Sequence, residues 1–315
     1  MDVHLRELRY FAAVATELHF TRAAEGLHVS QPALSRQIRQ LEALLGVTLF
    51  DRDRRQVTLT PAGSVLLPLA RQVLDDWDKA TRVIAHAQAD QRATLTVGLH
   101  TGVGRGLIPA LTSRFAQVRP GWSLELHQVR WDDATAGLAD GRTDVAVLWL
   151  PIPEPTGFCW KVLAREARWV AMSVGHPLAH RKRVSFAELA DQPFLALPAS
   201  AGVLRDYWLA LDHRDRPPLV AGEVSTPDET FEAVARGVGV VLLSSGNAGM
   251  YRRDDIVARP VTGLSPSELA VAWRADDHRR VVADLIDACD ASLASGGVKR
   301  RAASIASASD PAHQL

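Results

Sequence analysis

The chain has little cysteine and no long apolar run. Its 315 residues contain two cysteines, Cys159 and Cys289, far apart in the sequence. Charged residues interrupt the N-terminus, so no export signal is expected, and we predict both cysteines as buried, reduced thiols. No apolar run approaches the roughly 20 residues that a membrane helix needs. These absences favour a cytoplasmic protein, associated with the nucleoid if it binds DNA, and no membrane partner.

The sequence also lacks net charge and the spacing of common catalytic motifs. The formal net charge is +0, so only a local excess of basic residues can indicate nucleic acid. There is no C-x-x-C, H-E-x-x-H or G-x-S-x-G motif, and no metal-spaced pair among His100, His127, His176 and His180. A glycine cluster follows a predicted strand, but its G-x-G-x-G spacing is not that of dinucleotide folds: Gly102, Gly104 and Gly106. We expect no enzyme, no metal and no cofactor.

The N-terminal residues have the periodicity of three short helices. Residues 5–18 carry apolar side chains at helical spacing, and Thr21 is the expected cap of a second helix. Ser30 is the expected N-cap of a third helix, whose first turn accommodates Pro32 and which ends at Gly46. Two β-like runs around a basic turn follow. The pattern predicts an all-α winged helix-turn-helix over residues 1–61.

The third helix has a polar face suited to the major groove of DNA. Its apolar stripe leaves the opposite face for arginine and glutamine, which can bond guanine and adenine edges. The basic turn between residues 49–52 and 56–59 is suited to phosphate contact. The residues expected to contact DNA are Thr21, Ser30, Gln31, Pro32, Ser35, Arg36, Arg39, Arg52, Arg54 and Arg55.

A long helix is expected over the linker at residues 62–92. Thr60 and Pro61 are typical of a helix start, and apolar residues then recur with alternating spacings of four and three. This seam favours a partner helix, although packing of the helix on its own domain stays open. The residues expected in the dimer contact are Leu66, Val73, Trp77 and Ile84.

From about residue 93 strand-like runs alternate with helices up to residue 294. The alternation is typical of parallel α/β sheets. The length favours two lobes with a cleft: lobe I at about 93–162 and 268–294, and lobe II at about 163–267. Residues 295–315 are Ser/Ala-rich and are expected to be a disordered tail, with accessory DNA contact as the alternative.

Residues 5–63 closely resemble the LysR-type transcriptional regulators. The matching stretches are LTPAG and LRYFAAVATELHFTRAAEGLHVSQPALSRQIRQLEALLGVTLFDRDRR, with weaker echoes in DGRTDVAV, GHPLA and ARGVGVVLLS. The resemblance implies a dimerising linker helix and a two-lobed, periplasmic-binding-protein-like domain for a small organic effector. It also implies a homodimer that commonly assembles into a homotetramer.

The resemblance places an effector site between the lobes. Thr101 matches the position where the family usually has a ligand-contacting hydroxyl, and the family's second polar contact falls on Trp131, which indicates a larger or aromatic ligand. Ser200 and Thr226 match contact positions of the other lobe. Trp149 is either a structural hinge residue or a ligand contact.

The expected function is therefore effector-modulated binding to an interrupted inverted-repeat operator in double-stranded DNA. Two alternatives stay open. One is a constitutive DNA-binding regulator without a ligand, and the other is an α/β enzyme with an appended DNA-binding domain.

Overall fold

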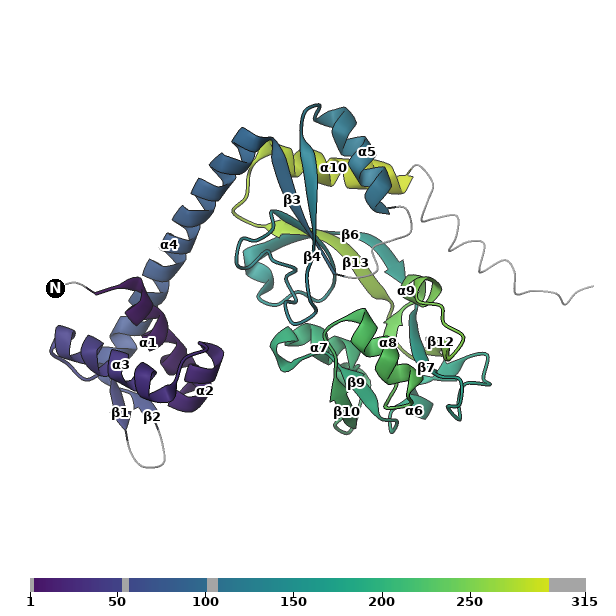
Figure 1. Ribbon diagram of the computed structural model, residues 1–315, viewed down its shortest axis with the longest axis horizontal. Coiled ribbons are helices and arrows are strands. Elements are labelled where there is room, and N and C mark those ends of the chain that lie inside the picture. Colours follow the sequence, from purple (N-terminus) through teal and green to yellow (C-terminus); the bar gives the residue numbers. More distant parts are fainter. Residues whose placement is uncertain (1–2, 53–56, 101–106, 295–315) are drawn as a thin grey trace, which may run out of the picture. The chain divides into compact units, whose positions relative to one another are not determined.

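The computed structural model describes residues 3–52, 57–100 and 107–294, which fall into two compact units (Figure 1). The units are Met1–Gln88 and Ala89–Leu315. Within the described ranges, no helix combines the length and the hydropathy that crossing a membrane requires. The predicted tail at residues 295–315 lies outside the described residues.

The N-terminal unit is the predicted winged helix-turn-helix. Its elements in chain order are α1 (Leu5–Glu17), α2 (Phe20–Gly26), α3 (Gln31–Leu45), β1 (Phe50–Arg52), β2 (Val57–Leu59) and the larger part of α4 (Pro61–Arg92). β1 and β2 pair antiparallel to form the wing. Three aromatic rings meet in the core: Phe50 lies 5.5 Å from Phe11 and 5.8 Å from Phe20 between ring centroids. The wing is thereby fastened to the first two helices.

The predicted ends of α3 are confirmed. The Ser30 hydroxyl accepts a hydrogen bond from the Ala33 amide at 3.4 Å, and Pro32 lies in the first turn. Gly46 ends the helix with a φ of 70°, a left-handed conformation that glycine adopts without steric cost.

The predicted cap of α2 is wrong by two residues. The helix begins at Phe20, and the ring of His19 accepts the hydrogen bond from the Arg22 amide, so His19 has the capping role that was expected of Thr21. Phe20 turns into the core, so the helix starts before Thr21. Thr21 is exposed in the first turn.

The first turn of α4 bonds to and packs against residues 48–49, which precede the wing. The Thr60 hydroxyl donates to the Thr48 carbonyl at 2.7 Å and accepts from the Gly63 amide at 3.0 Å, which confirms it as the N-cap. A Cβ at position 63 would lie 2.2 Å from the Leu49 carbonyl oxygen. Only glycine allows so close an approach, which explains its place in the LTPAG stretch.

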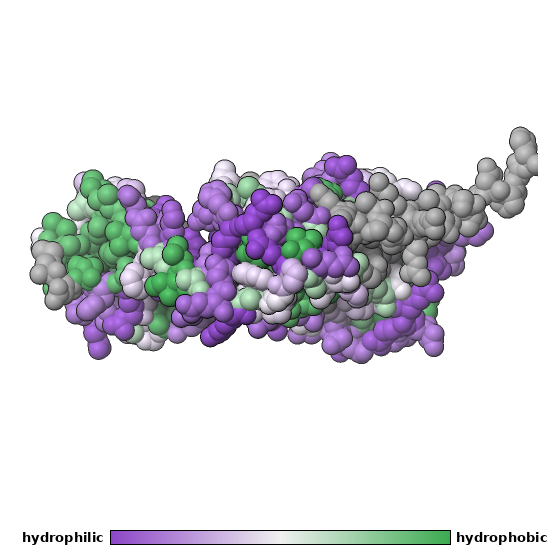
Figure 2. Space-filling view, turned by 90° about the horizontal axis from the view of Figure 1, so that it is seen from above, coloured by the Kyte–Doolittle hydropathy of each residue, from purple (hydrophilic) through white to green (hydrophobic). Residues whose placement is uncertain are grey.

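The predicted seam along α4 has two parts. Leu66 and Ala70 pack in the core of the N-terminal unit. Farther along, the apolar side chains of Val73, Trp77 and Ile84 are 47%, 50% and 61% exposed. Figure 2 shows hydrophobic residues gathered on one face of this unit. Leu66 therefore contacts its own domain, whereas the other three residues are available to a partner helix.

The first lobe of the C-terminal unit is built on a five-stranded sheet of order β4-β3-β5-β13-β6. The strands are β3 (Thr94–Leu99), β4 (Ser123–Gln128), β5 (Val145–Trp149), β6 (Phe158–Glu166) and β13 (Ser267–Arg274). Two helices pack together on this sheet around Leu111, Phe115 and Leu285: α5 (Leu107–Val118) and α10 (Arg280–Ala294) (Figure 1).

The second lobe has a four-stranded sheet of order β11-β7-β12-β8 and a parallel pair β9-β10. Its strands are β7 (Arg168–Ser173), β8 (Val184–Ser185), β9 (Phe194–Ala196), β10 (Val220–Glu223), β11 (Val241–Ser244) and β12 (Ile256–Thr262). Its helices are α6 (Phe186–Leu189), α7 (Val203–Trp208), α8 (Pro227–Ala235) and α9 (Ser245–Met250). Three short 3-10 turns, η1 (Pro155–Gly157), η2 (Ala199–Ala201) and η3 (Leu211–His213), complete the described elements.

The prediction of parallel sheets is only partly right, because both large sheets are mixed. β3 runs parallel to β4 and β5, but β13 runs antiparallel to β5 and β6. β7 likewise pairs antiparallel with β11 and β12. The lobes join where β6 leads into β7 at Ala167 and where Ser265 leads into β13, so β6 extends lobe I to Glu166, beyond the expected limit of 162.

Candidate functional site

The exposed face of α3 is the candidate DNA interface. Leu34, Ile38 and Leu41 are fully buried, so the helix can turn only its opposite face outward. Exposed on that face are Gln31, Pro32, Arg36 and Arg39, with Ser35 half-buried beside them. The start of the helix thus carries donors and acceptors of the kind that read base edges.

The polar residues of this face differ in how far their side chains are engaged. The Gln31 amide donates to the Ser35 hydroxyl at 2.9 Å, and the Arg39 guanidinium donates to the Ser35 carbonyl at 3.2 Å. The Arg36 side chain has no hydrogen bond or ion pair with any residue that the structure describes. Its guanidinium can therefore reach a base without breaking such a contact.

The remaining predicted DNA contacts come from α2 and the wing. Thr21 is exposed, and the Ser30 hydroxyl is engaged as the cap of α3. The backbone of Arg52 ends β1. The side chain of Arg52, together with Arg54 and Arg55, lies outside what the structure describes.

A pocket lies between the two lobes of the C-terminal unit. It encloses about 730 Å³ of empty space, part of which is open to solvent. Among the described residues, His100, Trp131 and Trp149 line it from lobe I, and the others come from lobe II, from β9 to β11 and from α7 to α9.

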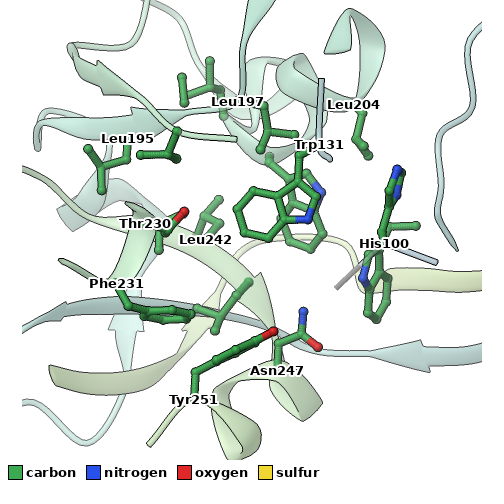
Figure 3. Close-up of a pocket in the computed structure, with 17 residues that line it drawn as sticks. His100, Trp131, Leu195, Leu197, Leu204, Thr230, Phe231, Leu242, Asn247 and Tyr251 are labelled. Atoms are coloured by element: carbon green, nitrogen blue, oxygen red, sulfur yellow. The ribbon is translucent and has the colours of Figure 1, made fainter. Parts of the chain in front are cut away.

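Aromatic rings from both lobes line this pocket among aliphatic side chains. Trp149 meets Trp208 edge to face, with centroids 6.1 Å apart and an interplanar angle of 83°, so one ring pair spans the lobes. Phe231 and Tyr251 stack at 4.6 Å and 29° on the lobe II side. In Figure 3 the indole of Trp131 stands between His100 and the Thr230 side of the pocket. The rings offer faces and edges to a flat ligand.

The polar groups of the pocket are neutral. No Asp, Glu, Lys or Arg is among its lining residues within the described part of the chain. The Thr230 hydroxyl is engaged, since it donates to the Thr226 carbonyl at 2.7 Å. Burial lowers the pKa of His100, and a nearby backbone hydrogen bond to Asp133 opposes this effect. His100 is therefore neutral at pH 7.

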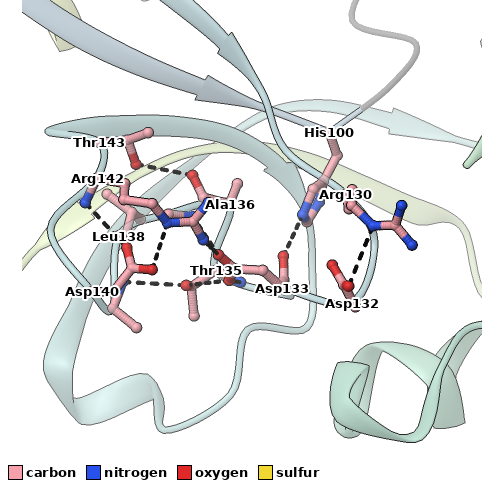
Figure 4. Close-up of polar contacts among 12 residues, drawn as sticks. His100, Arg130, Asp132, Asp133, Thr135, Ala136, Leu138, Asp140, Arg142 and Thr143 are labelled. Atoms are coloured by element: carbon pink, nitrogen blue, oxygen red, sulfur yellow. Dashed lines mark hydrogen bonds and ion pairs between the residues drawn. The ribbon is translucent and has the colours of Figure 1, made fainter. Parts of the chain in front are cut away.

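A tightly bonded loop fixes the His100 ring. Nε2 of His100 lies 2.7 Å from the Asp133 carbonyl, to which it donates as the neutral tautomer. The Asp133 carboxylate accepts from the amides of Thr135 and Gly137, both at 2.9 Å, and from Arg142 at 2.5 Å (Figure 4). Lobe I thus presents a rigid wall at the end of β3.

The predicted effector residues divide into three groups. Trp131 and Trp149 line the pocket, whereas Thr101 lies outside the described residues. Ser200 is exposed on η2 and Thr226 caps α8 by accepting from the Glu229 amide at 3.3 Å, and neither lines the pocket. The Thr226 hydroxyl has a structural task that explains its position after a strand.

Sequence reasoning missed the lobe II aromatics. Trp208, Phe231 and Tyr251 lie in or next to short helices, where aromatic residues usually indicate core packing. No motif or spacing in the sequence separates them from ordinary core residues.

The expectation of two buried thiols is half wrong: Cys289 is buried, but Cys159 is exposed on β6, and neither lines the pocket.

Comparisons with known proteins agree over both units. The profile of the bacterial regulatory helix-turn-helix protein, lysR family, matches residues 5–64, and that of the LysR substrate binding domain matches residues 88–294. The Hca operon transcriptional activator HcaR of Escherichia coli K12 is 33% identical over 93% of this chain and 99% of its own length. The dual regulator OxyR of the same strain is 36% identical over 84% of this chain and 87% of its own.

Solved structures show the same architecture. A cysteine-to-serine mutant of Corynebacterium glutamicum OxyR with bound H2O2 is 26% identical, with a TM-score of 0.53 over 100% of this chain and 98% of that one. Full-length BenM is 26% identical, with a TM-score of 0.51 over 93% of this chain and 97% of that one.

Proposed function

The chain belongs to the LysR family of transcriptional regulators, and we propose that an aromatic effector in the pocket between the lobes controls its binding to an operator. As a regulator with a helix-turn-helix, it acts by binding DNA and not by catalysis. The relatives that match nearly the whole chain are activators and regulators, which leaves no support for an appended enzyme.

The aromatic wall of the pocket carries the proposal about the effector. Five rings line a pocket that has no formally charged side chain among its described residues: Trp131, Trp149, Trp208, Phe231 and Tyr251. Stacked or edge-on aromatic contacts contribute about 0.5–1.5 kcal/mol beyond the burial of area. A flat ring with one small polar substituent fits this lining better than a small polar metabolite does.

The composition of the pocket favours an organic effector over a peroxide. One similar structure holds H2O2, as its name states, and several relatives are hydrogen peroxide-inducible activators. Here neither cysteine lines the pocket, and the lining side chains are mostly aromatic and aliphatic. This composition supports an organic effector.

On the DNA side, we propose that two α3 helices read an interrupted inverted repeat. The exposed apolar stripe at Val73, Trp77 and Ile84 supports pairing of two α4 helices, and the family resemblance supports assembly into a dimer of dimers. A two-fold dimer places its recognition helices on two half-sites, so the symmetry of the operator follows that of the protein.

Matched ligand pairs test the effector class. The full-length protein is titrated by calorimetry with benzoate against cyclohexanecarboxylate, and with phenol against cyclohexanol. In each pair the ring is aromatic or saturated while the polar group is kept. We expect the aromatic member to bind about 2- to 13-fold more tightly, the ratio equivalent to 0.5–1.5 kcal/mol. Equal affinities within each pair, or no binding by any of the four, would contradict an aromatic site.

A further inference from the structure

Ser225 joins the two lobes directly beside the pocket. Its carbonyl accepts a hydrogen bond from the amide of Trp131, which follows β4 in lobe I, at 3.2 Å. Its hydroxyl accepts a second hydrogen bond from the guanidinium of Arg130. Ser225 itself follows β10 in lobe II and is buried. One lobe II residue therefore holds two consecutive residues of lobe I.

The contact continues into α8 as a directed chain of hydrogen bonds. Arg130 donates to the Ser225 hydroxyl, which in turn donates to the Glu229 carboxylate at 3.1 Å. The Ser225 amide donates to the same carboxylate oxygen at 2.9 Å. These bonds and the Arg130 charge lower the pKa of Glu229, so the carboxylate is ionised at neutral pH. A cation and an anion at the two ends polarise the hydroxyl between them.

Each member of this chain stands next to a residue of the pocket wall. Arg130 precedes Trp131, and Glu229 precedes Thr230 and Phe231 in the first turns of α8. Separating the lobes at this point must break the bonds to Ser225 and withdraw Trp131 from the lobe II wall. The bonds are thus coupled by covalent geometry to the closed shape of the pocket.

We infer that Arg130, Ser225 and Glu229 form a latch that holds the cleft closed over the effector and positions Trp131. The latch gates exchange of the ligand, because it lies outside the pocket lining but must open for Trp131 to move. This inference rests on the proposed function for the identity of the site, but the closure itself can be tested without a ligand.

Two variants interrupt the latch, and a third is the control. Ser225→Ala removes only the hydroxyl, and Arg130→Ala removes an exposed guanidinium. Asp132→Ala removes the other partner of Arg130, at 3.4 Å, and leaves Ser225 untouched (Figure 4). Hydrogen exchange at the Trp131 amide of the ligand-free full chain reports opening. Stopped-flow tryptophan fluorescence with benzoate reports the association and dissociation rates.

We expect faster exchange at Trp131 and about tenfold faster dissociation of benzoate in both latch variants, with the double variant no worse than either single one. Association should also become faster, because the same opening admits the ligand to the empty cleft, and Asp132→Ala should match the wild type. Unchanged exchange at Trp131 in both variants overturns the latch, whether or not benzoate binds. Faster hydrogen exchange at the Trp131 amide with an unchanged dissociation rate of benzoate overturns the role of the latch as a gate. Failure of benzoate and phenol to bind the wild type contradicts the proposed function instead, and the exchange result then decides the latch alone.

Discussion

Replacing Trp131 by alanine should weaken an aromatic effector without weakening DNA binding. The indole stands in the pocket and makes no hydrogen bond to Ser225 through its side chain, so the variant keeps the backbone bond at 3.2 Å. A ligand lying on one face of the ring covers roughly 60 Å² of it, about 1.5 kcal/mol at about 25 cal/mol per Å². Aromatic geometry adds about 0.5 kcal/mol at the low end of its range. The expected loss is about 2 kcal/mol, or about 30-fold in Kd.

The assay is calorimetric titration of the full-length protein with whichever of benzoate and phenol binds more tightly. Trp160→Ala is the matched control, because Trp160 is 40% exposed on β6 and does not line the pocket. Melting curves for both variants show whether the fold is retained. An affinity of Trp131→Ala within about twofold of the wild type, at unchanged stability, would refute the assignment of the pocket as the effector site.

Other consequences concern the DNA-binding unit and the dimer. Arg36→Ala should weaken specific operator binding by about 1–3 kcal/mol at one base position in a footprint, since the exposed Arg36 side chain has no hydrogen bond or ion pair within the described ranges. Arg6→Ala, which removes another exposed arginine, should leave the footprint unchanged, and equal footprints for both variants would show that Arg36 does not read a base. Trp77→Glu should shift sedimentation to smaller species, because a carboxylate would replace the largest apolar residue of the stripe, while Lys79→Gln makes the same charge change elsewhere on α4. If Trp77→Glu stayed dimeric like the control Lys79→Gln, the result would count against the pairing of two α4 helices. Gly63→Ala should destabilise the N-terminal unit by about 3 kcal/mol in chemical denaturation, since its Cβ would lie 2.2 Å from the Leu49 carbonyl. Gly26→Ala, with open space around it, should not, and equal losses would mean that the close approach is not the cause.

The N-terminal unit could be predicted almost entirely because its signals are local. A Ser30 cap, a proline in the first turn and a left-handed Gly46 specify one helix within a single short stretch of sequence. The error at Thr21 has a local origin too. Two potential caps, His19 and Thr21, stand close together in the sequence, and only the burial of Phe20 decides between them.

The order and direction of the strands in the lobes could not be predicted in the same way. β6 is FCWKVLARE, half-exposed and interrupted by charges, so it lacks the apolar run of β5. It belongs to the sheet because β13, which lies far along the chain, pairs with it from Ser267 opposite Glu166. Such a pairing depends on the path of the whole chain and leaves no periodicity in either segment.

The candidate site was accessible to sequence reasoning only where lobe I forms it. Trp131 and Trp149 follow or end recognisable strands, and both line the pocket. Phe231 is in α8, where its spacing is that of a core residue, and it reaches the pocket because it lies in the first turns of that helix. Thr226 shows the converse: a hydroxyl after a strand serves a cap or a ligand equally well, and the hydrogen bond from the Glu229 amide favours the cap.

The central claim is that occupancy of the pocket alters DNA binding, and one titration tests it most directly. Full-length protein is titrated onto labelled DNA from the region flanking its own gene, with and without a saturating concentration of the aromatic ligand that calorimetry identifies. Coupling between sites is typically about 1–3 kcal/mol, so the account predicts about a 5- to 150-fold change in affinity or an equivalent change in the footprint. The same affinity and the same footprint with the pocket full and empty would contradict the account and identify a constitutive DNA-binding regulator.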